Sequence, residues 1–240
     1  MTGPGGVAVV TGASSGIGEA VARRLAGRGR ALVLVGRDRD RLAAVAGRTG
    51  GHPVPADLTT RAGREAVVAA AGPAPGLLVH AAGAGLAGPL AAAEPEQLEA
   101  LVAVNLTAAI TLTRALLPGL TLGRGHVVLV ASVAALGVAG EAAYSATKAG
   151  LRGFADALRL EAAVGVTTVL PGAVDTPFLA RRGYDRTVPR PVPAERVAEA
   201  ALRGAGRGRA EVFVPGWLAL AARVHGVAPG LFARASRRFG

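Results

Sequence analysis

The sequence predicts an α/β fold, a single doubly wound domain whose mostly parallel, seven-stranded sheet carries helices on both faces. Short, uniformly apolar segments alternate with segments of helical pattern, which is typical of a parallel sheet buried on both sides. A glycine-rich turn, TGASSGIG, lies directly between the first apolar segment and the first helical one. At 240 residues and 51% hydrophobic content, the chain is long and apolar enough to bury one large core.

The expected strands are the apolar segments that end in small or polar residues. They lie at 7–10, 31–35, 52–55, 77–80, 126–130, 166–170 and 211–214. In such sheets ligands bind at the carboxyl ends of the strands, so one rim collects the candidate site residues. The chain divides into one domain over residues 1–214 and a C-terminal helical extension over residues 215–240.

The turn after the first strand is suited to binding phosphate. Its glycines let the backbone approach a pyrophosphate closely, and the start of the following helix directs N–H groups and a partial positive charge toward it. The spacing is G-x-x-x-G-x-G rather than G-x-G-x-x-G, so the flanking strand and helix carry the prediction. The candidate cofactor-binding residues of this turn are Gly12, Ser14, Ser15, Gly16, Ile17 and Gly18.

The second strand ends at Gly36, Arg37 and Asp38, where a Rossmann fold contacts the adenosine ribose. An acidic residue there accepts hydrogen bonds from the 2′-hydroxyl, whereas an arginine can pair with a 2′-phosphate. Position 36 is not acidic and Arg37 follows it, so we expect NADP(H) in preference to NAD(H). The alternative is that Arg37 is one more surface arginine, and Asp38 could partly neutralise it.

Small or polar residues also follow the third, fourth and sixth strands. The carboxylate of Asp57 can accept a hydrogen bond from the adenine amino group or cap the following helix, and the sequence does not separate these roles. Small residues after the fourth strand let a nucleotide pass over the backbone. The further cofactor-binding candidates are Asp57, Leu58, Ala82, Gly83, Pro171, Gly172 and Thr176.

Tyr144 lies four residues before Lys148, the only lysine of the chain, in a predicted helix. Side chains at this spacing share a face and can meet. A neighbouring positive charge favours the ionised phenolate, so the pair suits a general acid or base. The alternative is a packed aromatic residue beside a solvated charge. The rarity of lysine here favours the chemical interpretation.

Two more polar residues stand out near the same rim. Asn105, the only asparagine, interrupts the apolar stretch LVAVNLTAAI, where a buried amide must find partners. It could bond backbone and water at a helix kink, or be a satisfied core asparagine. Ser132 follows the fifth strand.

These motifs, in this order and at these intervals, resemble those of the short-chain dehydrogenase/reductase family over roughly residues 6–214. The resemblance implies a tetrad of Asn105, Ser132, Tyr144 and Lys148. Tyr144 would exchange a proton with the substrate oxygen during hydride transfer between the nicotinamide and a carbonyl or secondary alcohol. Ser132 would hold that oxygen, Lys148 would bind the nicotinamide ribose and promote ionisation of the tyrosine, and Asn105 would hold a water. Thr176 would position the carboxamide. The resemblance also implies that residues 1–214 form a dinucleotide-binding and catalytic domain with a substrate loop at about 175–193.

One departure from the family pattern lies at the end of the fourth strand. The family often carries Asn-Asn-Ala-Gly, and this chain has His80, Ala81, Ala82 and Gly83. An amide that usually ties the central strands is therefore missing, and we expect cofactor binding to survive because the glycine remains. The alternative function is a catalytically silent nucleotide-binding scaffold or sensor of the same fold.

Composition limits the other classes. The chain has no cysteine and four scattered histidines, so we expect no metal site. Its net charge of +11 is spread along the chain with only 3% aromatic residues, so we expect no nucleic-acid partner. The uncharged stretch 66–93 is too broken by proline and glycine for a spanning helix. The start has no signal-peptide pattern, and we expect a cytoplasmic protein.

The C-terminal extension mixes apolar residues with arginines. It could form a helix pair that acts as a lid or a dimer contact, or a basic amphipathic segment on a membrane surface. We expect the packed arrangement, in a homodimer or homotetramer with a small-molecule carbonyl or alcohol substrate.

Overall fold

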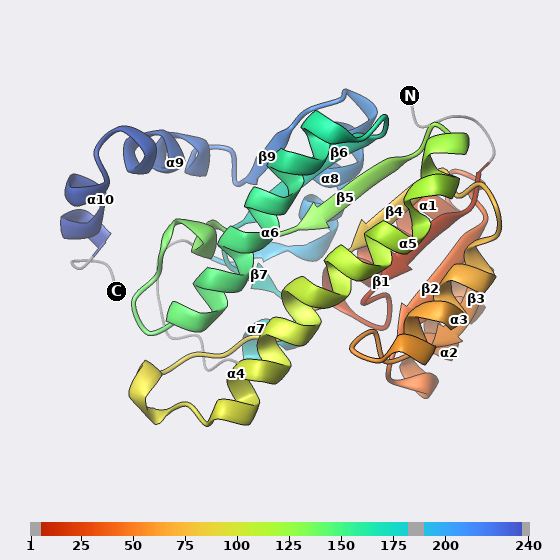
Figure 1. Ribbon diagram of the computed structural model, residues 1–240, viewed down its shortest axis with the longest axis horizontal. Coiled ribbons are helices and arrows are strands. Elements are labelled where there is room, and N and C mark those ends of the chain that lie inside the picture. The colour runs from red at the N-terminus through yellow and green to blue at the C-terminus, as the bar shows by residue number, and fades with distance from the viewer. Residues whose placement is uncertain (1–5, 182–189, 237–240) are drawn as a thin grey trace.

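The computed structural model describes residues 6–181 and 190–236. Within these residues the chain forms a seven-stranded, entirely parallel sheet in the order β3-β2-β1-β4-β5-β6-β9, which confirms the predicted doubly wound α/β fold (Figure 1). Four strands have the predicted bounds, and the other three differ by one residue at each end. The strands are β1 (Ala8–Thr11), β2 (Leu32–Gly36), β3 (His52–Pro55), β4 (Leu77–His80), β5 (His126–Val130), β6 (Gly165–Pro171) and β9 (Glu211–Val214).

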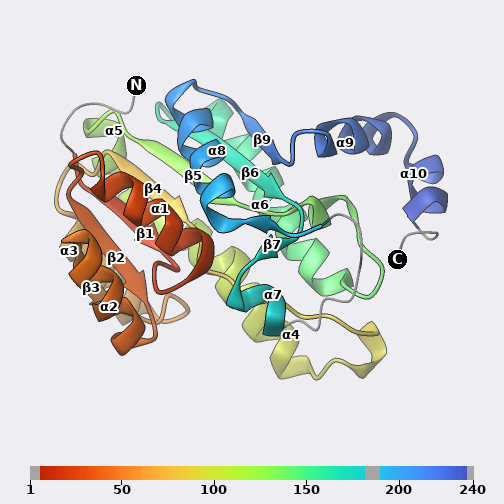
Figure 2. The same ribbon diagram turned by 180° about the vertical axis from the view of Figure 1, so that it is seen from behind.

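Helices cover both faces of the sheet, because neighbouring residues of each buried strand point to opposite sides. Val10 packs in the core beneath one set of helices, and Val9 packs beneath the other. The first set, in front in Figure 2, is α1 (Gly16–Ala26), α2 (Arg39–Thr49) and α8 (Ala194–Gly206). The second set, on the opposite face, is α3 (Arg61–Ala71), α5 (Ala108–Leu122) and α6 (Ala142–Glu161).

Shorter elements surround the carboxyl ends of the strands. A two-stranded parallel pair, β7 with β8, was not predicted, and residues 182–189 of the expected substrate loop lie outside the described residues. These shorter elements are η1 (Leu90–Ala92), α4 (Pro95–Val102), η2 (Ala103–Thr107), η3 (Val133–Leu136), β7 (Val174–Asp175), α7 (Pro177–Arg181) and β8 (Val192–Pro193).

The stretch Pro95–Leu122, made of α4, η2 and α5, is long and apolar enough to cross a membrane by length and composition alone. Its α5 part lies on the sheet, with Leu112, Leu116 and Leu120 buried in the core. We therefore interpret this stretch as a core helix.

The C-terminal extension is helical, as expected. It consists of α9 (Leu218–Val227) and α10 (Pro229–Ser236), which pack on each other and stand out from one end of the molecule (Figures 1 and 2). None of its described residues lines the large cavity at the strand ends. The described part of the helix pair thus lies beside the cavity, and its expected role as a lid or a dimer contact stays a prediction.

Candidate active site

A cavity of about 350 Å³ runs along the carboxyl ends of the central strands. It collects all but two of the predicted site residues. Gly18 and Asn105 lie behind its wall. The predicted residues that line it are Gly12, Ser14, Ser15, Gly16, Ile17, Arg37, Asp57, Leu58, Ala82, Gly83, Ser132, Tyr144, Lys148, Pro171, Gly172 and Thr176.

The glycine turn joins β1 to α1 in a conformation that side chains would block. Gly12 and Gly16 have φ values of +66° and +57°, in the left-handed region. A Cβ on Gly12 would lie 2.7 Å from the backbone of Ala81. On Gly18 it would lie 2.2 Å from the carbonyl oxygen of Gly12, so this glycine lets α1 begin directly against the turn. The helix thus presents its N-terminal N–H groups to the cavity.

The tie between the central strands is made by a threonine rather than by the missing amide. The Oγ1 atom of Thr11 in β1 donates to the Val79 carbonyl at 3.3 Å and accepts from the N–H groups of Ala81 and Ala82 at 3.2 and 3.1 Å. This fixes the cavity floor after β4. The departure at position 80 therefore leaves the strand connection intact.

His80 has another partner. Its Nε2 atom lies 2.8 Å from Oγ1 of Thr113 in α5, and both side chains are buried. Burial lowers the pKa of His80 to about 3. The ring is therefore neutral near pH 7 and links β4 to the helix that follows Asn105.

At the adenosine end of the cavity, exposed charged residues lie at the ends of β2 and β3. Arg37 lines the cavity, while the carboxylate of Asp38 accepts from the Arg41 N–H at 3.0 Å and contacts the Arg41 guanidinium at 3.3 Å. Asp38 therefore caps α2 and is engaged with an arginine other than Arg37.

Asp57 does not cap the helix that follows it, so that alternative was wrong. Its Oδ1 atom accepts from the N–H and hydroxyl of Thr59 at 2.9 and 2.7 Å, and the hydroxyl of Thr60 caps α3 instead. The hydrogen bonds from Thr59 lower the pKa of Asp57, and the positive charge of Arg37 adds to this effect. The carboxylate is thus ionised and faces the cavity.

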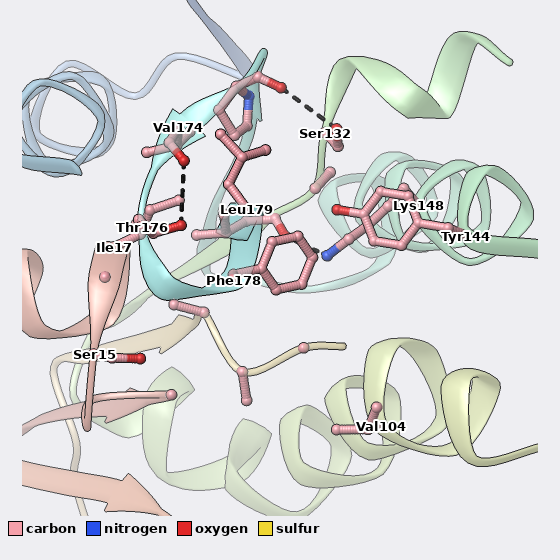
Figure 3. A pocket seen from close by; sticks show the side chains of 18 of the residues that line it. Ser15, Ile17, Val104, Ser132, Tyr144, Lys148, Val174, Thr176, Phe178 and Leu179 are labelled. Carbon is pink, nitrogen blue, oxygen red and sulfur yellow. Dashed lines mark hydrogen bonds between the residues drawn. The ribbon is translucent and has the colours of Figure 1, made fainter. Parts of the chain in front are cut away.

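The reaction end is built on α6, which buries one face against the core and turns Tyr144 and Lys148 into the cavity (Figure 3). The Lys148 ammonium donates to the Val130 carbonyl at 3.0 Å, and its Nζ atom lies 5.6 Å from the centroid of the Tyr144 ring. The predicted pair therefore meets, and both side chains are buried. Lys148 brings a fixed positive charge beside the phenol.

Asn105 supports this end from behind. It lies in η2, a π-helical segment between α4 and α5, where an extra residue loosens the backbone pattern. Its Oδ1 atom accepts from the Ala84 N–H at 2.8 Å, and its Nδ2 atom donates to the Ala84 carbonyl at 2.9 Å and to Thr147 Oγ1 at 3.1 Å. The Thr147 hydroxyl in turn donates to the Tyr144 carbonyl at 2.8 Å. Asn105 is thus a satisfied core amide in an irregular helical segment, and its expected bond to water stays a prediction.

Ser132 and Thr176 complete the predicted set. The Ser132 hydroxyl begins η3, where it accepts from the Ala134 N–H at 3.1 Å and lies 3.5 Å from the Pro171 carbonyl (Figure 3). The Thr176 hydroxyl donates to the Val174 carbonyl at 3.2 Å. Both therefore have defined positions on the wall that also holds Tyr144.

Sequence reasoning did not single out several residues that line the reaction end, of which Phe178, inside the expected substrate loop, and Glu141 are the most informative. The Phe178 ring lies 6.1 Å from the Tyr144 ring, centroid to centroid. Glu141 precedes Tyr144 by three residues, a helical spacing that could have identified it. The further lining residues of this kind are Val104, Val133, Ala134, Val138 and Leu179.

The cavity fits a nicotinamide dinucleotide in shape and chemistry. A glycine turn at a helix start suits the pyrophosphate, and an added Cβ on Gly16 would already lie 3.0 Å from the Thr176 side chain. Arg37 and Asp57 would hold the adenosine part, and Lys148 and Thr176 would hold the nicotinamide part. Tyr144 and Ser132 then line the end where the nicotinamide would lie.

Known proteins with a similar sequence or fold match most of this chain. A family model described as short chain dehydrogenase matches residues 6–187. An uncharacterised oxidoreductase of Myxococcus xanthus is 38% identical over 248 residues, with 96% of each chain covered. A short-chain dehydrogenase from Sphingobium yanoikuyae in complex with NADPH has a TM-score of 0.81 at 33% identity, covering 94% of this chain and 96% of that one. A 3-ketoacyl-(acyl-carrier-protein) reductase from Brucella melitensis complexed with NADH has a TM-score of 0.80 at 29% identity, covering 88% and 96%.

Proposed function

Because this chain belongs to the short-chain dehydrogenase family, we propose that it is an NADP(H)-dependent oxidoreductase acting on a carbonyl or secondary alcohol, with Tyr144 as general acid and base. One observation carries the proposal. A buried phenol, a buried ammonium and a serine hydroxyl line the same end of a cavity whose other end is shaped for a dinucleotide. That combination suits proton transfer to an oxygen held in a fixed place.

Each residue of the tetrad has a distinct task in this proposal. When bound, the nicotinamide supplies or accepts the hydride. Tyr144 donates a proton to the substrate oxygen during reduction and removes it during oxidation, while Ser132 hydrogen-bonds the same oxygen. Lys148, held by the Val130 carbonyl, keeps a positive charge next to the phenol. Asn105 fixes the backbone of Ala84 and, through Thr147, the turn of α6 that carries Tyr144.

The reaction end of the cavity favours a substrate with apolar groups around its reacting oxygen. Its wall is formed largely by Val104, Val138, Phe178 and Leu179. Such a surface excludes water and binds apolar carbon, and it offers few fixed polar contacts beyond the tetrad. We therefore propose ketones, keto-esters or acyl thioesters as the substrate class.

The preference for NADP(H) depends on Arg37. Its guanidinium lies exposed at the adenosine end of the cavity, and Asp38 is engaged with Arg41. A 2′-phosphate there can form charge-assisted hydrogen bonds with the arginine, whereas the 2′-hydroxyl of NAD(H) cannot be recognised in this way. This supports the phosphorylated cofactor.

The test is NADPH consumption by the purified chain against a panel of ketones, keto-esters and acyl thioesters. We expect turnover with at least one class, and Tyr144→Phe should lower kcat by about a thousandfold while NADPH affinity stays within about threefold. Retained cofactor binding is the control for folding. Unchanged turnover in Tyr144→Phe would refute the assigned role, and cofactor binding without turnover on any class would favour a silent nucleotide-binding protein.

A further inference from the structure

The C-terminal extension presents an apolar stripe that the fold does not use. Trp217, Leu220, Val224 and Val227 are 56%, 65%, 37% and 88% exposed. Their spacing of three, four and three residues places them within an arc of about 80° on a helix that turns about 100° per residue. They therefore form one continuous strip along α9, which we call the α9 stripe.

The opposite face of α9 attaches the helix to the rest of the molecule. Leu218 is buried, and the ring of His225 makes an edge-on contact with Phe232 of α10, with centroids 5.1 Å apart. The helix is thus held by one face and presents the other to solvent. The α9 stripe takes part in neither contact, so its exposed apolar side chains indicate a binding site for a surface outside the molecule.

The charge of the extension is of a single sign. From Val212 to the end, the sequence has four arginines and no aspartate or glutamate. Arg223 is exposed just beside the α9 stripe, and Arg234 is exposed on α10. Several arginines elsewhere in the molecule pair with carboxylates, as Arg24 does with Glu199 at 3.0 Å. The extension instead combines an apolar strip with uncompensated positive charge along its own sequence.

We propose that this helix pair docks the protein on the surface of an anionic lipid bilayer, with the α9 stripe at the boundary between headgroups and acyl chains. Tryptophan is favoured at that depth, and the arginines can extend to lipid phosphates while their stems stay in apolar surroundings. α9 has ten residues, about half of what a spanning helix needs, so it lies on the surface.

A second copy of the chain fits this surface less well. Pairing two α9 stripes across a two-fold axis would bring the arginines of both extensions together with no carboxylate from either one. An anionic bilayer offers phosphates to the same arginines. Charge complementarity therefore selects the lipid surface.

The position of the helix pair gives docking an orientation. β9 is parallel to its neighbour β6, so it ends at the same edge of the sheet as the cavity, and α9 packs against η3, part of which lines the cavity (Figure 1). In a docked molecule, the edge of the sheet that holds the cavity would be the edge nearer to the bilayer.

The experiment is co-sedimentation of the full chain with vesicles of phosphatidylglycerol and phosphatidylcholine, compared with vesicles of phosphatidylcholine alone. Trp217 is the only tryptophan of the chain, so its emission reports on the α9 stripe itself. We expect binding to the anionic vesicles at least tenfold tighter than to the neutral ones, with a blue shift of the emission and weakening by added salt. Absence of vesicle binding or of the blue shift would overturn the proposal.

Substitutions distinguish binding through the α9 stripe from a general effect of changing exposed apolar side chains. Leu220→Glu with Val227→Glu should weaken binding at least tenfold, and replacing Arg223 and Arg234 by glutamine should weaken it about fivefold for each arginine. The matched control is Leu122→Glu with Leu160→Glu, at two exposed leucines of α5 and α6, which should leave binding unchanged. Equal losses in both leucine pairs would contradict the assignment.

Sedimentation velocity tests the alternative that a second copy of the chain, rather than a bilayer, covers the α9 stripe. If the variant at Leu220 and Val227 forms a smaller oligomer than the unmodified chain, and neither binds vesicles, the α9 stripe is a subunit contact and the proposal is wrong. NADPH binding, measured on every variant, checks that each one is folded.

Discussion

At the reaction end of the cavity Lys148 and Asn105 are buried and bonded to backbone groups, whereas at the adenosine end Arg37 and Asp57 are exposed and lie on turns. Lys148 is held by the carbonyl of a central strand, and Asn105 makes three hydrogen bonds. The side chains of Arg37 and Asp57 are exposed to solvent. The hydrogen bonds of the Asp57 carboxylate come from Thr59, only two positions away. The reaction end is therefore part of the core, and the adenosine end is added to the core's edge.

This difference predicts how the two ends respond to change. A buried hydrogen-bonding group that loses its partner remains desolvated, so substitution at the reaction end should lower stability together with turnover. An exposed side chain on a turn can be removed without leaving such a group. Substitution at the adenosine end should therefore change cofactor affinity alone.

Asn105→Ala provides the largest effect. It removes three hydrogen bonds and leaves the Ala84 backbone and the Thr147 hydroxyl without this partner, so we expect the free energy of unfolding to fall by about 3 kcal/mol. Turnover should fall at least about tenfold, because Ala84 and the Tyr144 backbone lose their common support. Urea denaturation and steady-state kinetics measure the two effects.

The matched control for this change is Thr111→Ala, further along the same helical stretch. The Thr111 hydroxyl donates to the Thr107 carbonyl of its own helix at 2.7 Å, in an exposed position. Its loss should cost less than about 1 kcal/mol and leave turnover unchanged. If Asn105→Ala were as stable as Thr111→Ala, the contrast between the two ends of the cavity would fail.

Arg37→Ala tests the adenosine end and comes second in size. The Kd for NADPH should rise about thirtyfold, which corresponds to about 2 kcal/mol for charge-assisted hydrogen bonds to a phosphate, and the Kd for NADH should change less than about twofold. Stability should stay the same within about 0.5 kcal/mol. Titration calorimetry with both cofactors measures the preference.

Arg39→Ala, at the start of α2, is the nearby control, since Arg39 is also exposed but does not line the cavity. It should leave both affinities unchanged. Equal weakening of NADPH and NADH by Arg37→Ala would show that this arginine does not read the 2′-phosphate.

The strands could be predicted closely because each is a short apolar run that ends at a small or polar residue. Tyr144 and Lys148 could be paired because their spacing is local to one helix. The partners of Asn105 could not, since Thr147 lies 42 residues further along the chain and meets it only through the packing of η2 against α6. The α9 stripe was hidden for a similar reason. Its residues were visible in the sequence, but which face of α9 the fold would cover was not.

His80 is a second residue whose partner could not be predicted from the sequence, and its substitution has the smallest expected effect of the variants discussed, the controls aside. The sequence indicated that an amide of the family pattern was replaced by His80, but not that the ring would be buried against Thr113. In the folded chain the pKa of His80 is about 3, and in the unfolded chain it returns to about 6.5. Between these values the unfolded chain binds more protons, so stability falls as the pH drops below about 6.5. His126, with a pKa lowered to about 4 by burial, acts in the same direction.

His80→Asn should remove one of these two contributions. Lowering the pH from 7 to 5.5 should therefore destabilise the variant by about 1 kcal/mol less than it destabilises the unmodified chain. Urea denaturation at the two pH values measures the difference, whatever the effect of the substitution at pH 7. Because His80 joins β4 to the helix beyond Asn105, loss of turnover in acid should also begin at lower pH in the variant. If both proteins showed the same pH dependence, the His80 ring would not be held neutral in the folded chain. The contact between His80 and Thr113 would then fix the cavity floor to the core less firmly than the structure indicates.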